Sequence, residues 1–524
     1  MSLTGELFVG HTRRLGGGAS HFALSAETGE MLEPRFTSAS NADVEEVCEL
    51  AWEAFSQLRQ TSSEERAKLL DTIAQNILSL DAALVERATL ETGLPRARIE
   101  GERTRTVNQL RMFAQVIRYG ACFDIRIDEA QPNRAPIPSP ELRMRNIPLG
   151  PVVVFSASNF PLAFSVAGGD TASAFAAGCP VIVKAHSAHP GTSELVAGAV
   201  QDAVRDAGLP SGTFSMVFTR DHSVSHQLVA DSRVRAVGFT GSRSGGKALA
   251  KTANAREVPI PVYAEMSSIN PVVLLPGALS KHSEKIANEF VSALTLGAGQ
   301  FCTNPGLIIA IDGPDLEAFL TAATSAFEEV DAQTMLTPSI HQSYCEGVEH
   351  FKSYNDVVKV AEGQSNKRFG GQPFLFKTTG RAFLANSKLQ EEVFGSSSLV
   401  VACKSPKEII SVLESLEGQL TTAVHYENSD ADLARELIPL LEIKAGRILF
   451  NGFGTGVEVA HAMVHGGPFP ATSDGRTTSV GSKAIERFMR PVCYQNVPTE
   501  LLPKQLFDYE LTPAMVNGKL TLPA

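Results

Sequence analysis

The chain has 524 residues, of which 43% are hydrophobic and 20% are charged, and its formal net charge at pH 7 is −11. This length suits two or three domains, and the composition is ordinary for a globular protein with a large core. The negative charge and the lack of a basic segment argue against a nucleic-acid partner. Because no apolar run is long enough for a membrane span or a signal peptide, we expect a cytoplasmic protein without a membrane partner.

The first 130 residues are expected to be rich in helices. The segments 41–60 and 63–80 have the periodicity of amphipathic helices, and 100–120 predicts a long, arginine-rich helix. Residues 131–140 then contain four prolines, which favour an extended arm over a packed core.

Short apolar runs that predict buried strands begin after this arm. They lie at 151–155, 180–184, 235–239, 271–275, 306–311 and 398–402. Helical patterns lie among them, the clearest near 281–297, 314–330 and 406–416. Since buried strands that alternate with helices indicate parallel sheets, the predicted fold class is α/β. A last strand, from Arg490 to Tyr494, is expected to pair at an exposed position.

The cysteines argue against disulfides and against a structural metal. Seven are spread along the chain without a CxxC pair, so neither a disulfide framework nor a metal site is expected. Cys302 differs from the others because it lies between a helical stretch that ends in glycines and an apolar strand. At such a junction a thiol can face a cleft, where backbone N–H groups lower its pKa. Taken alone, a buried packing cysteine is the better interpretation.

Two other polar residues suggest acid–base chemistry and oxyanion binding. Glu265 is flanked by small and apolar residues, where desolvation would raise its pKa and suit it to take a proton from water. Asn159 follows the strand 151–155, at the end where α/β sheets bind ligands, and its amide could donate to an oxyanion. The alternatives are a surface or capping glutamate and a turn asparagine that caps the next helix.

Three segments could contact a dinucleotide cofactor. A glycine-rich turn follows the strand 235–239, where glycines would let the backbone and a helix N-terminus approach a phosphate. A lysine ends the strand 180–184, and the motif EEVFG could contact a ribose and a nicotinamide ring. An ordinary turn, a solvated lysine and a charged loop are the alternatives, and the GxGxxG motif is absent. The candidate residues are Lys184, Gly241, Ser242, Gly246, Glu392 and Phe394.

The order and spacing of these motifs resemble the aldehyde dehydrogenase superfamily from about residue 20 to 497. The resemblance implies a Rossmann-type cofactor domain, an α/β catalytic domain and a small β oligomerisation arm, in a homodimer or homotetramer. The implied boundaries are 1–130 and 148–267 for the cofactor domain, 268–475 for the catalytic domain, 131–147 and 485–500 for the arm, and 501–524 for a C-terminal extension.

The same resemblance implies a mechanism. Cys302 would attack the aldehyde carbonyl, and the Asn159 amide with the Cys302 backbone N–H would form the oxyanion hole. Hydride would leave to NAD(P)+, and Glu265 would activate water to hydrolyse the thioester. Because members that use phosphate or coenzyme A often lack this glutamate, its presence favours water as the final acceptor.

One departure from the family pattern bears on the cofactor. NAD-preferring relatives commonly carry an acid three residues after the lysine, and this chain has Ser187 there. Without the acid, no carboxylate at this position repels the 2′-phosphate of NADP+. NADP+ is therefore favoured, and NAD+ remains the alternative. Arg220 and His222, in the loop after the next strand, could add positive charge.

Longer motifs refine the resemblance to the 2-oxoglutarate semialdehyde (2,5-dioxopentanoate) dehydrogenase branch. They are SNFPLAFSVAGGDTASAFAAGCPVIVKAHSAHPGTSE (158–194), GQFCTNPG (299–306) and GVEVAHAMVHGGPFPAT (456–472). This branch also implies that His461 lies near the active site. The carboxylate of such a substrate needs a cation, and the helix with Arg105 and Arg111 could supply one.

Other functions remain open at this point. An NADP-dependent medium- or long-chain fatty aldehyde dehydrogenase would need an apolar channel, which Phe164 and Phe453 could line. A thiol esterase without redox chemistry needs only Cys302, Asn159 and Glu265. A structural protein on the same fold would be expected to have lost these residues, and none is lost.

Overall fold

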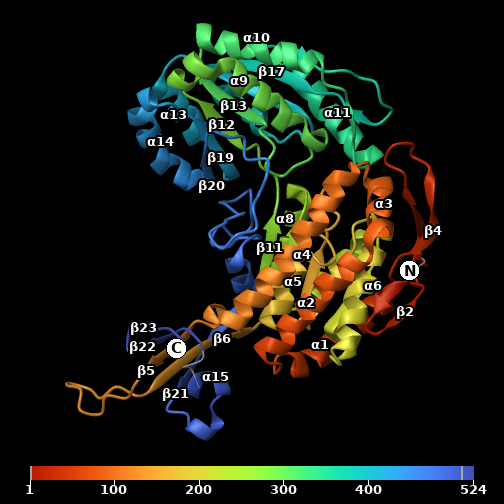
Figure 1. Cartoon of the computed structure of the whole chain (residues 1–524), viewed down its shortest axis with the longest axis vertical. Helices are drawn as coiled ribbons and strands as arrows, with labels where there is room; N and C mark the ends of the chain where they lie inside the picture. The colour runs from red at the N-terminus through yellow and green to blue at the C-terminus, as the bar shows by residue number, and fades with distance from the viewer. Residues whose placement is uncertain (1–2, 509–511, 524) are drawn as a thin grey trace.

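The structure is a computed structural model that describes residues 3–508 and 512–523 (Figure 1). It has the predicted α/β architecture, with helices packed on parallel sheets. Figure 1 shows a lobe around one sheet at the top, a larger helix-rich body in the middle and a narrow arm that projects at the lower left.

The N-terminal helices lie over the middle body. They are α1 (Asn41–Leu58), α2 (Ser63–Ser79), α3 (Asp81–Thr92) and α4 (Arg96–Tyr119), preceded by the hairpin of β3 (Ser20–Leu24) and β4 (Met31–Thr37). The three predicted helices are confirmed, and α3 was not predicted. Ser40 and Ser62 form capping boxes with Asp43 and Glu65, which fix the starts of α1 and α2. Helix α4 packs along α2 and also contacts α5 and α3 (Figure 1).

The sheet of the middle body has the order β11-β10-β7-β8-β9-β1-β2. Its strands are β1 (Leu7–Val9), β2 (Thr12–Arg14), β7 (Val152–Phe155), β8 (Val181–Lys184), β9 (Phe214–Val217), β10 (Ala236–Thr240) and β11 (Val262–Glu265). Its helices are α5 (Gly169–Ala177), α6 (Pro190–Asp206), α7 (His222–Ala230) and α8 (Arg243–Asn254). The strands from β11 to β9 are parallel, and Lys184 pairs with Phe155 while Glu265 pairs with Thr240. Their carboxyl ends therefore share one edge, where ligands bind in such sheets.

The sheet of the upper lobe has the order β15-β17-β18-β13-β12-β19-β20. Its strands are β12 (Pro271–Leu274), β13 (Leu307–Ile311), β15 (Val358–Glu362), β17 (Phe374–Thr379), β18 (Ser397–Cys403), β19 (Gln419–His425) and β20 (Ala445–Phe450), beside a small pair of β14 (Gln333–Thr334) and β16 (Gly370–Gly371). Its helices are α9 (Pro276–Thr295), α10 (Pro314–Glu328), α11 (Pro338–Ser353), α12 (Gly380–Ala385), α13 (Pro406–Ser415) and α14 (Ala431–Lys444). The predicted strands and helices of this region are confirmed.

The arm is a sheet with the order β21-β6-β5-β22-β23. Its strands are β5 (Ile125–Asp128), β6 (Leu142–Pro148), β21 (Met489–Gln495), β22 (Ala514–Val516) and β23 (Lys519–Thr521), and β21 is the strand predicted at 490–494. The sheet begins before residue 131 because Ile125 and Ile127 alternate with exposed residues and are buried on one face. The C-terminal extension joins it, since β22 pairs in parallel with β5. Part of the extension, 509–511 and 524, lies outside the described residues.

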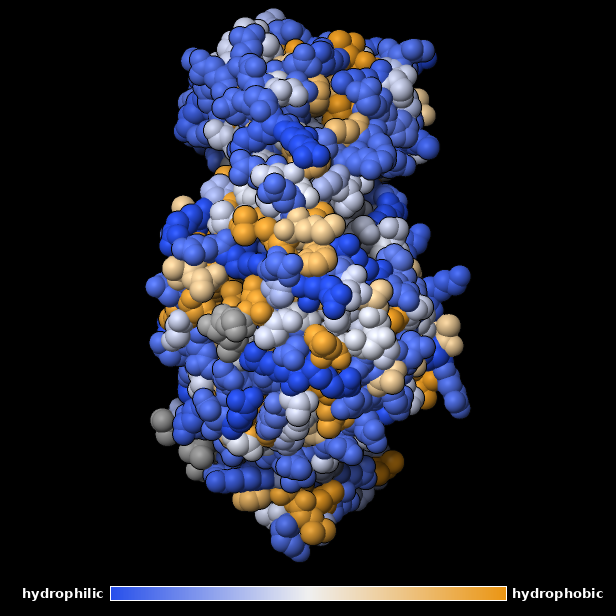
Figure 2. All heavy atoms as spheres, turned by 90° about the vertical axis from the view of Figure 1, so that its right-hand side faces the viewer, coloured by the Kyte–Doolittle hydropathy of each residue, from blue (hydrophilic) through white to orange (hydrophobic). Residues whose placement is uncertain are grey.

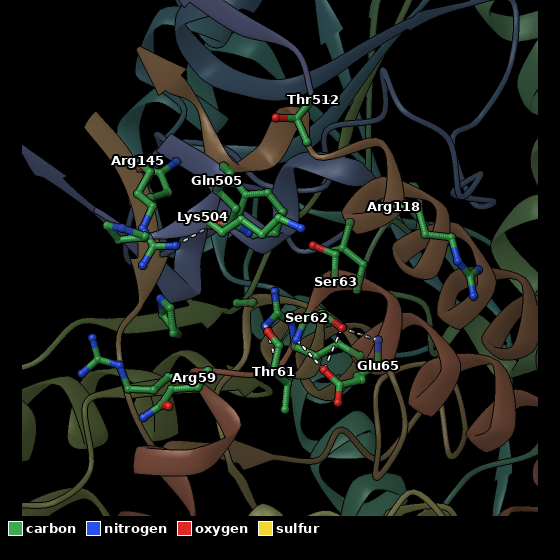
Figure 3. Close-up of a pocket in the computed structure, with 18 of the residues that line it drawn as sticks. Arg59, Thr61, Ser62, Ser63, Glu65, Arg118, Arg145, Lys504, Gln505 and Thr512 are labelled. Carbon is green, nitrogen blue, oxygen red and sulfur yellow. Dashed lines mark hydrogen bonds between the residues drawn. The ribbon is translucent and has the colours of Figure 1, made fainter. Parts of the chain in front are cut away.

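The C-terminal extension also borders a cavity of about 870 Å³ (Figure 3). The cavity lies between the start of α2, the end of α4 and the short helix α15 (Lys504–Phe507), and Arg59, Arg118 and Lys504 are among its lining residues. Arg145 of β6 donates a hydrogen bond to Gln505, which ties this helix to the arm (Figure 3).

The molecular surface is mostly hydrophilic on the face drawn in Figure 2, where apolar residues lie in separate small patches. Within the ranges that the structure describes, we find no helix with both the length and the apolar character needed to cross a bilayer.

Candidate active site

Cys302 lies on the loop between α9 and β13, and glycines shape this loop. The short turn η3 (Leu296–Gly299) contains Gly297, Ala298 and Gly299 with φ of 58°, 57° and 67°, in the left-handed region. A Cβ on Gly299 would lie 2.4 Å from the carbonyl carbon of Gly395, so only glycine fits there. The loop of Cys302 is thereby packed directly against the end of the EEVFG motif.

Hydrogen bonds hold the backbone on both sides of Cys302. Nδ2 of Asn270 donates to the carbonyl oxygens of Cys302 and Asn304, each at 2.9 Å. Nδ2 of Asn304 donates to the carbonyl oxygen of Gly395 at 3.1 Å. Asn270 itself has a φ of 48°, a conformation that asparagine tolerates better than most residues. Asn270 was not predicted as a site residue, although an asparagine just before a predicted strand is a turn signal.

The Cys302 thiol contacts a buried pair made by Glu265 and His465. Sγ of Cys302 lies 3.3 Å from Nε2 of His465, and the same nitrogen lies 2.9 Å from Oε1 of Glu265. The Ser479 hydroxyl donates to Oε2 of Glu265 at 2.9 Å. The ligand atoms of the three residues lie within 4.8 Å of one another, a set that could also hold a metal ion. The arrangement can pass a proton between the thiol and the carboxylate.

The environment shifts the pKa values of Glu265 and Cys302 in opposite directions. Burial opposes ionisation of Glu265, but the charge of His465 and hydrogen bonds from His465 and Ser479 outweigh it, so the pKa of Glu265 is lowered. Burial and the neighbouring Glu265 carboxylate raise the pKa of Cys302 well above its ordinary value. The carboxylate is therefore the ionised partner, and the thiol needs a proton acceptor before it can attack.

Asn159 lies next to the loop of Cys302, as a residue of an oxyanion hole must. It follows β7 and is buried, with 8% of its surface exposed. Its Nδ2 donates to the carbonyl oxygen of Gln300 at 3.0 Å, two residues before Cys302. An amide nitrogen carries two hydrogens, so the second can serve a ligand.

A cavity of about 340 Å³ opens beside Cys302 and contains both aromatic and cationic groups. Arg105 and Phe164 line it, whereas Arg111 is exposed elsewhere on α4. Phe453 is buried in the core of the upper lobe against Phe290 and His425, so it does not line a channel. The lining also includes Arg98, Gly101, Glu102, Phe160, Phe301, Thr303, Thr455, Val457 and His465.

The structure does not bring His461 to this site. His461 is exposed and borders a different cavity with Gln115 and Tyr119 of α4. The histidine beside the nucleophile is His465, four residues further along the motif VAHAMVHGG. The expectation for His461 is therefore corrected to His465, whose imidazole is held between Glu265 and Cys302.

A second cavity, of about 430 Å³, lies between the start of α8 and loops of the upper lobe. Ser242 caps α8 by accepting a hydrogen bond from the backbone N–H of Gly245, and Gly241 donates to the Glu265 carbonyl at 3.1 Å. Gly246 is buried, and a Cβ there would lie 2.7 Å from Sδ of Met266. Gly241, Ser242 and Gly246 thus shape the turn. The cavity itself is lined at this end by Arg243, Ser244 and Lys247, at the N-terminal end of α8, which favours an anion such as phosphate.

The EEVFG loop closes this second cavity from the side of the upper lobe. Glu392 lines the cavity and accepts a long hydrogen bond, of 3.4 Å, from the backbone N–H of Ser268. Burial raises the pKa of Glu392 to about 8. Phe394, two residues further on, is half-buried. Glu392 thus borders the cavity directly, whereas Phe394 is not part of its lining.

A cluster of basic groups stands at the end of β8. Lys184 is half-buried, and burial together with the charge of Arg220 lowers its pKa to about 8. Burial, Arg220 and Lys184 also lower the pKa of His21 to about 4. Ser187 is half-buried in the turn after β8, and His222 is the exposed first residue of α7. The end of β8 therefore carries positive charge from Lys184 and Arg220.

A thiol, a buried carboxylate and an amide donor thus lie at the edge of a parallel sheet, beside a glycine-rich turn that begins a helix. Enzymes that combine a nucleophilic thiol with a phosphate-bearing cofactor have this arrangement. A family model described as the aldehyde dehydrogenase family matches residues 25–491. The chain belongs to the aldehyde dehydrogenase family, as the order of its motifs predicted.

Individual relatives agree with this assignment. The chain is 53% identical to alpha-ketoglutaric semialdehyde dehydrogenase 2 of Azospirillum brasilense, over 99% of this chain and 100% of that protein. It is 48% identical to alpha-ketoglutaric semialdehyde dehydrogenase of Acinetobacter baylyi, over 93% of each. The structure of betaine aldehyde dehydrogenase of Staphylococcus aureus in complex with NAD+ superposes with a TM-score of 0.80 at 19% identity, covering 96% of this chain and 98% of that one.

Proposed function

We propose that this enzyme oxidises 2-oxoglutarate semialdehyde to 2-oxoglutarate with NADP+ as the preferred acceptor. The main support for this substrate is the 53% identity, over almost the whole of both chains, to a relative that is named for this aldehyde. The cavity beside Cys302 is compatible with it, because Arg105 lies in the lining and can meet a carboxylate. A medium- or long-chain fatty aldehyde is the second candidate, favoured by the aromatic walls of Phe160, Phe164 and Phe301.

The residues around Cys302 perform the steps of this oxidation. Glu265 accepts the thiol proton, with His465 in contact with both groups, and the thiolate attacks the aldehyde carbon. Asn159 and the Cys302 backbone N–H stabilise the oxyanion of the thiohemiacetal. When bound, the cofactor supplies the acceptor for the hydride whose loss leaves a thioester on Cys302. Once that first proton has left Glu265 for solvent, the carboxylate takes a proton from the water that attacks the thioester and passes it to the departing Cys302 sulfur, which releases the acid and restores the thiol.

The residues expected to hold the cofactor come from both sides of the second cavity. Gly241, Ser242 and Gly246 would contact the phosphates, and Glu392 and Phe394 the nicotinamide half. Lys184, Ser187, Arg220 and His222 would surround the adenosine ribose. The preference for NADP+ rests on the basic groups at this end and on the hydroxyl of Ser187, because a 2′-phosphate needs donors and positive charge.

The cofactor preference predicts the effect of restoring an acid at residue 187. Ser187→Glu is expected to lower kcat/KM for NADP+ at least about tenfold, because a carboxylate repels the 2′-phosphate, without lowering kcat/KM for NAD+. Ser187→Ala, which adds no charge, is the matched control and should lose much less. Initial rates with each cofactor at saturating aldehyde measure the effect. Equal losses with both cofactors in Ser187→Glu would contradict the proposed position of the phosphate.

The substrate proposal predicts a clear order among aldehydes. We expect kcat/KM for 2-oxoglutarate semialdehyde to exceed that for dodecanal at least about tenfold, because a site that pairs with a carboxylate leaves its cation unpaired when a neutral chain binds. Nicotinamide absorbance in initial-rate assays, with NADP+ and with NAD+, gives both values. A several-fold preference for dodecanal would overturn the proposal and favour the fatty aldehyde.

The arm supports a proposal about assembly. The arm projects from the body in Figure 1 and bears exposed apolar side chains such as Ile137, Leu520 and Leu522. We therefore keep a homodimer or homotetramer as the proposed state, with the arm as the contact. A free thiol as nucleophile suits a reducing compartment, in keeping with the predicted cytoplasmic location.

A further inference from the structure

One face of α4 lines the cavity beside Cys302. Arg98, Gly101, Glu102 and Arg105 have the i, i+3, i+4, i+7 spacing of a single helical face, and all four border the cavity. Gly101 contributes no side chain, and a Cβ there would meet no atom within 4 Å. The helix therefore leaves open space between its two arginines, next to the nucleophile.

The charge of Arg98 is already compensated. Its Nη1 lies 2.6 Å from Oε2 of Glu102, and its guanidinium lies over Phe160 and Phe301, at 4.6 and 5.1 Å from the ring centroids. The other oxygen of Glu102 accepts hydrogen bonds from the backbone N–H groups of residues 162 and 163. Glu102 is thus fully occupied, and Arg98 has little capacity for another anion.

Arg105 is different, because in the described part of the chain it has no carboxylate within 4 Å. Its Nη2 reaches only the carbonyl oxygen of Val457, at 3.5 Å, and its Nη1 is buried without a hydrogen-bond partner. Its guanidinium lies 5.1 Å from the ring centroid of Phe164, which holds it at the cavity wall. A guanidinium stays protonated in proteins, so this is a cation without a counter-ion. Removing such a charge from water is costly unless an anion pairs with it.

A second polar group in the lining also lacks a partner. Oγ1 of Thr455, on the loop after β20, is buried and has no hydrogen-bond partner among the residues that the structure describes. The backbone of Thr455 is fixed, because its carbonyl oxygen accepts a hydrogen bond from Oγ1 of Thr303, the residue after the nucleophile, at 3.2 Å. The cavity therefore offers a free cation and a free hydroxyl, between apolar walls, beside the reacting thiol.

We propose that Arg105 binds the carboxylate at the end of the substrate opposite the aldehyde, and that Thr455 donates to the adjoining keto oxygen. The aromatic walls would take the methylene groups between the two ends. The cavity would then select short ω-oxo acids over neutral aldehydes of the same length. This inference rests on the proposed function and assigns its specificity to two residues.

The test compares Arg105→Met with Arg111→Met, a matched control on an exposed part of the same helix. Arg105→Met should lower kcat/KM for 2-oxoglutarate semialdehyde about 100-fold, mainly through KM, which corresponds to about 2.8 kcal/mol at 1.4 kcal/mol per tenfold change. With pentanal, kcat/KM should be unchanged or higher. Arg105→Lys should recover part of the loss, since it restores the charge without the bidentate geometry. Arg111→Met should behave as the wild type with both aldehydes.

Product inhibition separates this inference from the proposed function. With pentanal as substrate, 2-oxoglutarate should inhibit the wild type, and its inhibition constant should rise about 100-fold in Arg105→Met but not in Arg111→Met. A wild-type preference for neutral aldehydes would overturn the proposed function. If the wild type prefers the oxo acid and Arg105→Met does not reduce this preference, the proposed role of Arg105 is overturned but the proposed function is not. Equal losses with both aldehydes, or a fall in melting temperature, would show a structural role for Arg105 instead.

Discussion

Replacing Cys302 by alanine is expected to abolish aldehyde oxidation, with a fall in kcat of at least about 10⁴-fold. No covalent intermediate can form without the thiol, and the oxyanion donors then have no tetrahedral adduct to stabilise. Of the other cysteines, Cys48, Cys179 and Cys403 are buried in the hydrophobic cores and cannot substitute. Nicotinamide absorbance with a high enzyme concentration measures the residual rate.

Two controls make this result specific. Cofactor binding, followed by quenching of protein fluorescence, should stay within about twofold of the wild type, because Cys302 lines the first cavity and is not in the lining of the second, where the cofactor is proposed to bind. Cys345→Ala and Cys493→Ala remove exposed thiols and should keep full activity. Retention of more than about 1% of the rate in Cys302→Ala would rule out the covalent mechanism.

The sequence predicted the parts of the site that local patterns encode. Strand ends are marked by apolar runs, so the positions of Lys184 and Asn159 at one sheet edge followed from the alternation of strands and helices. Glu265 was singled out by its apolar neighbours, whereas the strand β11 that carries it was not predicted. The exposed strand at 490–494 was also predictable from its position and composition. In each case the signal lies within a few residues of the feature that it predicts.

Residues that reach the site from distant loops could not be predicted in this way. His465 is separated from Glu265 by 200 residues, and the motif that contains it also offers His461, so only the folded structure distinguishes them. Ser479 and Asn270 act through hydrogen bonds to residues far along the chain, and such bonds leave no periodic pattern in the sequence. The strands β22 and β23 have three residues each, too few for a clear pattern, and they form because β5 presents an edge with which β22 pairs. Whether such short strands form depends on pairing with residues far along the chain rather than on the intrinsic strand propensity of their residues.

The second large effect is expected from Glu265→Gln, which should separate formation of the thioester from its hydrolysis. The amide cannot accept the proton of water, so steady-state kcat should fall about 10²- to 10⁴-fold. The variant also removes the proposed acceptor of the thiol proton, so Cys302 must ionise to solvent. This ionisation is easier than in the wild type because the negative charge that helps to raise the pKa of Cys302 is gone. Rapid-mixing measurements should therefore show one equivalent of reduced cofactor per active site, followed by slow turnover.

Two further measurements test whether this burst arises from a thioester that forms and is then hydrolysed slowly. Hydroxylamine cleaves thioesters without a general base, so it should restore turnover in Glu265→Gln and release a hydroxamate. Alkylation of Cys302 by iodoacetamide should have its midpoint at a lower pH than in the wild type, because the neighbouring charge is gone. Ser479→Ala is a milder variant, because it removes one hydrogen bond to the ionised carboxylate of Glu265 and so raises the pKa of Glu265. The acid limb of the pH profile of kcat should therefore move to higher pH. If Glu265→Gln shows neither a burst nor a response to hydroxylamine, a group other than Glu265 activates the water.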